Sequence, residues 1–118
     1  MAGTRGLDPR FAPIARQLIA WFRAQDARFV ITSGLRTRAD QARLFARYLR
    51  GEPDLFTVLP PGKSQHERGL AVDIARIGTH PAEDPILHDA GYRWRAAGGV
   101  WGGMSDPVHF EAPRAWRR

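Results

Sequence analysis

The sequence predicts an α+β fold in a single domain covering residues 1–118, and three observations predict it. The length of 118 residues is that of one domain. With 43% hydrophobic and 25% charged residues, the composition is ordinary for a globular protein with one core. Segments whose apolar residues recur every three or four positions alternate with short runs of period two, which indicates helices interleaved with strands.

The first helix is expected over residues 9–25. Asp8 and Pro9 form a start signal, a capping residue followed by proline at the first helical position. Apolar residues then recur at spacings of three and four, and we expect them in the core: Phe11, Ile14, Leu18, Trp21 and Phe22. A short strand follows over 28–32, and the Ser-Gly pair at 33–34 forms a turn.

The second helix is expected to open at Thr37. Thr37 and Asp40 form a variant capping box, with Asp in place of the usual Glu or Gln, and the helix runs to about Arg50. We expect it to bury its apolar residues, which are Leu44, Phe45, Tyr48 and Leu49. Residues 51–63 contain three prolines and two glycines, so they predict a surface loop bordering a cleft.

The remaining elements are shorter. An Asp-Pro pair at 84–85 repeats the start signal and opens a third helix. A two-residue strand is expected at 100–101, between two pairs of glycines. The last strand contains His109, and residues 112–118 are expected to form a loosely held tail.

The most strand-like run of the chain, residues 70–75, carries an acidic residue. Two alternating sets make it up: Leu70, Val72 and Ile74 in one, and Ala71, Asp73 and Ala75 in the other. Asp73 therefore points to the face opposite the aliphatic side chains. Because aspartate is depleted in strands, its presence here indicates either a functional role or a hydrogen-bonded core carboxylate.

Two histidines lie at or near strand faces that point away from the apolar side chains. His66 lies where a polar turn enters the strand of Asp73, and taken alone it is also explained as a turn residue. His109 lies in the last strand and faces away from Val108 and Phe110. Two imidazoles and one carboxylate form the ligand set of a catalytic zinc, with the fourth position left for water. The chain has no cysteine, which excludes a thiolate site.

Three blocks of sequence resemble one family. They are Ser33-Gly34-Leu35-Arg36-Thr37 with Gln41, then Ser64-x-His66-x-x-Gly69-x-Ala71-x-Asp73, then Asp106-x-x-His109-Phe110-Glu111. In this order, over residues 29–111, they are similar to zinc peptidases that include D-alanyl-D-alanine carboxypeptidases and dipeptidases and phage or bacterial L-alanyl-D-glutamate endopeptidases. The resemblance implies a small antiparallel sheet with helices packed on one face. Hedgehog signalling domains share this fold without proven peptidase activity.

The resemblance also implies a cofactor and a reaction. One Zn²⁺ ion per chain would be bound by His66, Asp73 and His109. The reaction would be zinc-dependent hydrolysis of peptide bonds in the stem peptides of bacterial peptidoglycan. L-alanyl-D-glutamate endopeptidase and D-Ala-D-Ala carboxypeptidase activities both remain open. A non-catalytic zinc module that binds cell wall or a protein is the alternative reading.

Catalytic roles follow from the same resemblance. Asp106 would be the general base, one methylene shorter than the Glu of many members, and Arg36 would bind the substrate carbonyl and its oxyanion. Ser64 and Gln41 would make further substrate or supporting contacts. The alternatives are Asp106 as a turn residue, Arg36 as a surface arginine, and two rival bases, Glu67 and Glu111. A further departure from the family pattern is a leucine at position 35 in place of tyrosine.

Net charge and the lack of long apolar runs indicate which partners and which location to expect. The net charge is +6, from 17 arginines and one lysine against 12 acidic residues, which suits an anionic cell wall. The arginines form no long basic run or aromatic-basic strand, so we expect no nucleic-acid partner. No run approaches the 18 apolar residues of a membrane span, and no signal peptide is recognised. We therefore expect a monomer made in the cytoplasm that acts on the cell wall, in phage lysis or on a virion, or a fragment of a larger protein.

Overall fold

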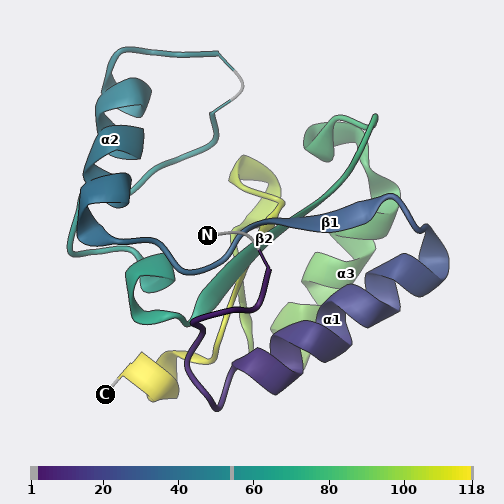
Figure 1. Cartoon of the computed structure of the whole chain (residues 1–118). Helices are drawn as coiled ribbons and strands as arrows, with labels where there is room; N and C mark the ends of the chain where they lie inside the picture. Colours follow the sequence, from purple (N-terminus) through teal and green to yellow (C-terminus); the bar gives the residue numbers. More distant parts are fainter. Residues whose placement is uncertain (1–2, 54, 118) are drawn as a thin grey trace.

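The computed structural model describes residues 3–53 and 55–117. Within them, the strands form one sheet in the order β1-β2-β4-β3, and every neighbouring pair is antiparallel. The strands are β1 (Phe29–Ser33), β2 (Ala71–Arg76), β3 (Val100–Trp101) and β4 (His109–Glu111). This arrangement confirms the predicted α+β fold with a small antiparallel sheet (Figure 1).

Two helices pack on one face of this sheet and form the core with it. The helices are α1 (Ala12–Gln25) and α3 (Pro85–Ala96). Phe110 of β4 is fully buried and contacts both of them, with ring centroids 5.7 Å from Phe22 of α1 and 6.0 Å from Trp94 of α3. Residues on the opposite face of β2 and β4 are thereby left free to form a site.

Helix α1 begins later than the Asp-Pro signal predicts. The carboxylate of Asp8 accepts hydrogen bonds from the backbone and side chain of Arg10 instead of capping a helix. The carbonyl of Asp8 accepts from the backbone N–H of Phe11 and Ala12, which closes a turn before the helix. Asp8 itself is held by its own N–H, which donates to the carbonyl of Gly69 at 3.0 Å.

Helix α3 continues through the glycine at position 91. A Cβ atom added to Gly91 would lie 2.0 Å from the ring of Trp101, so the glycine allows β3 to pack directly against the helix. The helix begins as predicted, since Asp84 accepts from the backbone N–H of Ile86 and Leu87.

Helix α2 (Arg38–Leu49) lies apart from α1 and α3, and it corrects the expected burial (Figure 1). Tyr48 is 37% exposed and Leu49 is 68% exposed, although both were expected in the core. The residue that α2 buries is Gln41, which is 1% exposed. An amphipathic pattern indicates an apolar face but does not say whether the core reaches it, and here the core lies under α1 and α3.

The C-terminal residues also differ from the expected loose tail. Residues Arg114–Arg117 form a 3-10 turn, η4, and Ala112 before it is buried. Trp116 packs against the core cluster, and the guanidinium of Arg10 lies 5.0 Å from the centre of its ring. None of the helices in the described residues is both long and apolar enough to cross a membrane.

Candidate metal centre and cleft

Strand pairing brings two of the candidate ligands together. Asp73 of β2 and His109 of β4 are directly opposite each other in the antiparallel register. Their neighbours Val72 and Phe110 are also opposite each other and are fully buried in the core. Because side chains alternate along a strand, Asp73 and His109 share the face that the helices leave uncovered.

A short 3-10 turn places the third candidate. Turn η1 (Gln65–Arg68) has a complete capping box, in which the side chains of Ser64 and Glu67 each accept from the other end of the turn. Gly69 ends it with a φ of 70°, and a Cβ there would lie 2.7 Å from the backbone nitrogen of Asp8. Only glycine fits such a position, which turns the chain into β2 and directs His66 toward Asp73.

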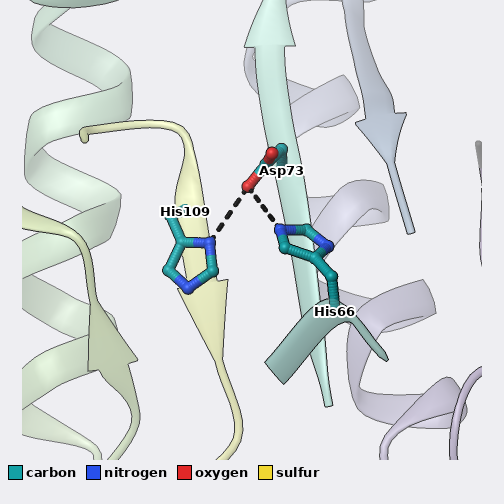
Figure 2. A group of neighbouring side chains, drawn as sticks. All are labelled: His66, Asp73 and His109. Atoms are coloured by element: carbon teal, nitrogen blue, oxygen red, sulfur yellow. Dashed lines mark hydrogen bonds and ion pairs between the residues drawn. The ribbon is translucent and has the colours of Figure 1, made fainter. Parts of the chain in front are cut away.

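The three side chains converge on one point (Figure 2). Oδ1 of Asp73 lies 3.1 Å from Nε2 of His66 and 3.1 Å from Nδ1 of His109. One nitrogen or oxygen from each residue lies within 4.8 Å of those of the other two. The structure therefore brings together the complete ligand set that the sequence predicts.

The outer nitrogens of both imidazoles face oxygen acceptors. Nδ1 of His66 lies 2.8 Å from the carbonyl oxygen of Gly34, and Nε2 of His109 lies 2.7 Å from Oε1 of Glu111. A carbonyl or carboxylate oxygen can only accept, so each outer nitrogen carries the proton. In the neutral imidazoles, both inner nitrogens then direct lone pairs at the oxygen of Asp73, an arrangement that requires a cation between them.

The pKa values of the metal-free site also indicate that a positive charge is needed between the imidazoles and the carboxylate of Asp73. Burial opposes ionisation of Asp73, but the charges and hydrogen bonds of His66 and His109 hold the pKa of its carboxyl well below the usual range. Burial likewise opposes protonation of His109, but hydrogen bonds to Asp73 and Glu111 raise the pKa of its imidazole to about 10. A proton thus occupies the place where a metal cation would bind.

Asp106 faces the cleft beside these ligands. Its carbonyl accepts from the backbone N–H of His109 at 3.2 Å, and this tight turn holds the two residues on the same side of the sheet. Burial, followed by the negative charge of Asp73, raises the pKa of the Asp106 carboxyl to about 7. A carboxylate with that pKa takes and returns protons near neutral pH.

Arg36 reaches the metal centre from the residues after β1. Its Nη2 donates to Oδ2 of Asp73 at 2.9 Å, on the oxygen turned away from the imidazoles. Its Nε donates to the hydroxyl of Ser33 at 2.9 Å, and its Nη1 donates to Oε1 of Gln41 at 3.2 Å. Arg36 is therefore not a solvated surface arginine. The expected contact residue Ser64 also lines the cleft, and its hydroxyl accepts from the backbone N–H of His66.

The two rival bases make other contacts. The carboxylate of Glu67 accepts from the backbone N–H of Gly62 and of Ser64, which fixes the turn η1. Glu111 bonds His109 through one oxygen and forms an ion pair with Arg117 through the other. The contact of Arg117 with Glu111 cannot be predicted from the sequence, because no local pattern links the C-terminal residues to the last strand.

A cleft of about 500 Å³ opens over the three candidate metal ligands. Its polar lining includes the three candidate ligands, Arg36 and Asp106. An apolar part of its lining, the apolar wall, comes from α2 and the segment after it, with Leu44, Leu55, Phe56, Val58 and Leu59. A groove that combines apolar residues with convergent polar groups is typical of a binding site for a small molecule or peptide.

The sequence matches the model of the VanY family, described as D-alanyl-D-alanine carboxypeptidase, over residues 4–97. The chain belongs to this family. It is therefore an enzyme of the peptidase class, and the resemblance found in the sequence is confirmed. The matched residues of this VanY-family chain include His66 and Asp73, and they end before Asp106 and His109. No curated protein matches the sequence.

Solved structures of similar proteins share the fold. The vancomycin-resistance D,D-pentapeptidase VanY of a VanB-type cassette, in complex with Zn(II), is 23% identical with a TM-score of 0.63, covering 90% of this chain and 72% of that one. VanYB in complex with D-alanine-D-alanine is also 23% identical with a TM-score of 0.66, covering 90% and 71%. The L,D-carboxypeptidase DacB of Streptococcus pneumoniae is 19% identical with a TM-score of 0.66, covering 95% and 74%.

Proposed function

We propose that the chain is a zinc-dependent peptidase that hydrolyses peptide bonds in the stem peptides of bacterial peptidoglycan. The observation that carries the proposal is the convergence of two imidazole nitrogens and a carboxylate oxygen within 4.8 Å, with both outer imidazole nitrogens facing oxygen acceptors. Nitrogen and carboxylate ligands in this number suit Zn²⁺ in a catalytic site. The Zn(II) complex of a VanY structure with the same fold supports this choice of metal.

The chain's own residues provide the proton transfers. When bound, Zn²⁺ supplies Lewis-acid activation of water and of the scissile carbonyl. Asp106, whose carboxyl already has a pKa raised to about 7 in the metal-free site, would accept a proton from the attacking water and give it to the nitrogen of the leaving amine. Arg36 has five N–H groups, and three of them make the hydrogen bonds described above. The two that remain, one on each Nη, have no partner among the described residues and would be available to the developing oxyanion.

The substrate follows from the family and from charge. A VanYB structure with this fold contains D-alanine-D-alanine, so the terminal D-Ala-D-Ala bond is the first candidate and the internal L-alanyl-D-glutamate bond is the second. The net charge of +6 favours approach to an anionic cell wall. Digestion of purified peptidoglycan followed by mass spectrometry distinguishes the bonds, since a carboxypeptidase releases one amino acid and an endopeptidase releases longer peptides.

Metal removal tests the proposal. The protein stripped with a chelator should lose hydrolysis of peptidoglycan and regain it when one equivalent of Zn²⁺ is returned. Hydrolysis that persists after complete metal removal would contradict the mechanism. Stoichiometric zinc binding with no hydrolysis would instead support the alternative, a non-catalytic module.

A further inference from the structure

Gln41 is a polar residue in an unusual place. It is 1% exposed, whereas the apolar Leu49 of the same helix is 68% exposed. Glutamine is rarely this deeply buried, and a buried amide without hydrogen-bond partners destabilises a fold. Its burial on a helix whose other residues are exposed or half-buried therefore indicates that its side chain makes specific contacts.

Both ends of the Gln41 amide are occupied. Oε1 accepts from Nη1 of Arg36 at 3.2 Å, and Nε2 donates to the backbone carbonyl of Leu59 at 2.8 Å. A guanidinium only donates and a carbonyl only accepts, so these partners allow a single orientation of the amide. Gln41 thus joins two parts of the cleft, the arginine behind the metal centre and the apolar wall to which Leu59 belongs.

The contact continues from Arg36 to a metal ligand. Arg36 donates to Oδ2 of Asp73 at 2.9 Å, while Oδ1 of the same carboxylate faces the two histidines. A continuous series of hydrogen bonds therefore runs from the backbone of Leu59 through Gln41 and Arg36 to Asp73. Side chains that hold a ligand carboxylate from behind fix its orientation toward the metal.

We propose that Gln41 is a positioning residue with two effects: it holds Arg36 on Asp73 and so supports metal binding, and it holds the apolar wall at Leu59 in place. The family resemblance leaves a substrate contact and a supporting contact open for Gln41, and this role is a supporting one in which the side chain does not contact the substrate. The inference rests on the proposed function in one respect, that Asp73 binds the metal. The effect on the wall is independent of that function.

The substitution Gln41→Leu removes both contacts at nearly constant volume. Arg36 loses a partner that holds it against Asp73, so we expect zinc to bind about 10–100-fold more weakly. The segment around Leu59 loses its hydrogen bond to α2, so chymotrypsin should cleave faster after Phe56. The absorption spectrum of the cobalt-substituted protein should also change, because it reports the geometry of the ligands directly.

Gln41→Glu separates the two effects. A carboxylate still accepts from Arg36 but cannot donate to the carbonyl of Leu59. We expect zinc affinity no lower than that of the wild type, together with faster chymotryptic cleavage. Gln17→Leu is the control for metal affinity, since the same substitution is then made at an exposed position of α1 that does not line the cleft. It should leave zinc affinity unchanged.

Thermal unfolding first shows that each variant is folded. Zinc affinity is then measured by competition with a chromophoric chelator, and chymotryptic cleavage is followed over time by mass spectrometry. A Gln41→Leu protein with wild-type zinc affinity and cobalt spectrum would overturn the positioning role. If that variant does not fold, Gln41→Glu decides, and equal cleavage of this variant and the wild type would overturn the role at the wall. Failure of the wild type to bind zinc would refute the proposed function, and the cleavage comparison would still test the contact with Leu59.

Discussion

Zinc binding should be strongly pH-dependent, because a proton on His109 competes with the metal. Hydrogen bonds to Asp73 and Glu111 raise the pKa of His109 to about 10 in the metal-free protein, so this imidazole is protonated throughout pH 6–8. The metal-bound imidazole carries no proton at the ligating nitrogen. One proton must therefore leave, and the loss of this proton alone should raise the apparent zinc affinity about tenfold per pH unit, or about 100-fold from pH 6 to 8, equivalent to about 2.7 kcal/mol.

Asp106 adds to this release near its own pKa. Its pKa is about 7, in part because of the negative charge of Asp73, and a bound dication offsets that charge. The wild type should therefore release more than one proton at pH 6. The variant Asp106→Asn should release only the proton of His109. The difference between this variant and the wild type then gives the contribution of Asp106.

Isothermal titration with zinc in two buffers of different ionisation enthalpy counts the released protons, and chelator competition at pH 6, 7 and 8 gives the affinities. His88→Ala is a matched control, because His88 lies on α3 outside the cleft and bonds the carbonyl of Pro81. It should release as many protons as the wild type. Equal zinc affinity at pH 6 and pH 8, with no proton release, would refute the protonation of His109 and the hydrogen-bond argument behind it.

Three further substitutions test the site and its support. Asp106→Asn should keep zinc bound but lower the turnover of peptidoglycan by about 10²–10⁴-fold, measured by release of stem-peptide fragments, and unchanged turnover would exclude Asp106 as the base. Glu111→Gln should weaken zinc binding about 10–100-fold, because the amide accepts a weaker hydrogen bond from His109 than the carboxylate does. Chelator competition measures this, and an unaltered zinc affinity would show that Glu111 does not support His109. Gly91→Ala should lower the free energy of unfolding in urea by about 1–3 kcal/mol, since the new methyl group would lie 2.0 Å from the ring of Trp101, and an unchanged midpoint would contradict this close packing.

The sequence determined which faces of the strands carry the site. In β2 and β4 the alternation of side chains separates Val72 and Phe110, which enter the core, from Asp73 and His109, which face the cleft. That separation depends only on the geometry of a strand, so it is visible without coordinates. The same holds for the turn that carries His66, whose capping residues and terminal glycine are local features.

Only the tertiary structure decided what supports these residues. Gln41 is buried and Leu49 exposed because α2 lies beside the cleft and not on the core, which its own periodicity does not reveal. Arg117 reaches Glu111 because the C-terminal turn packs back against the core, and a pattern read along the chain contains no information about that return. Local periodicity sets the direction of a side chain relative to its own backbone, whereas its partners depend on how distant segments pack, and this packing is a property of the whole fold.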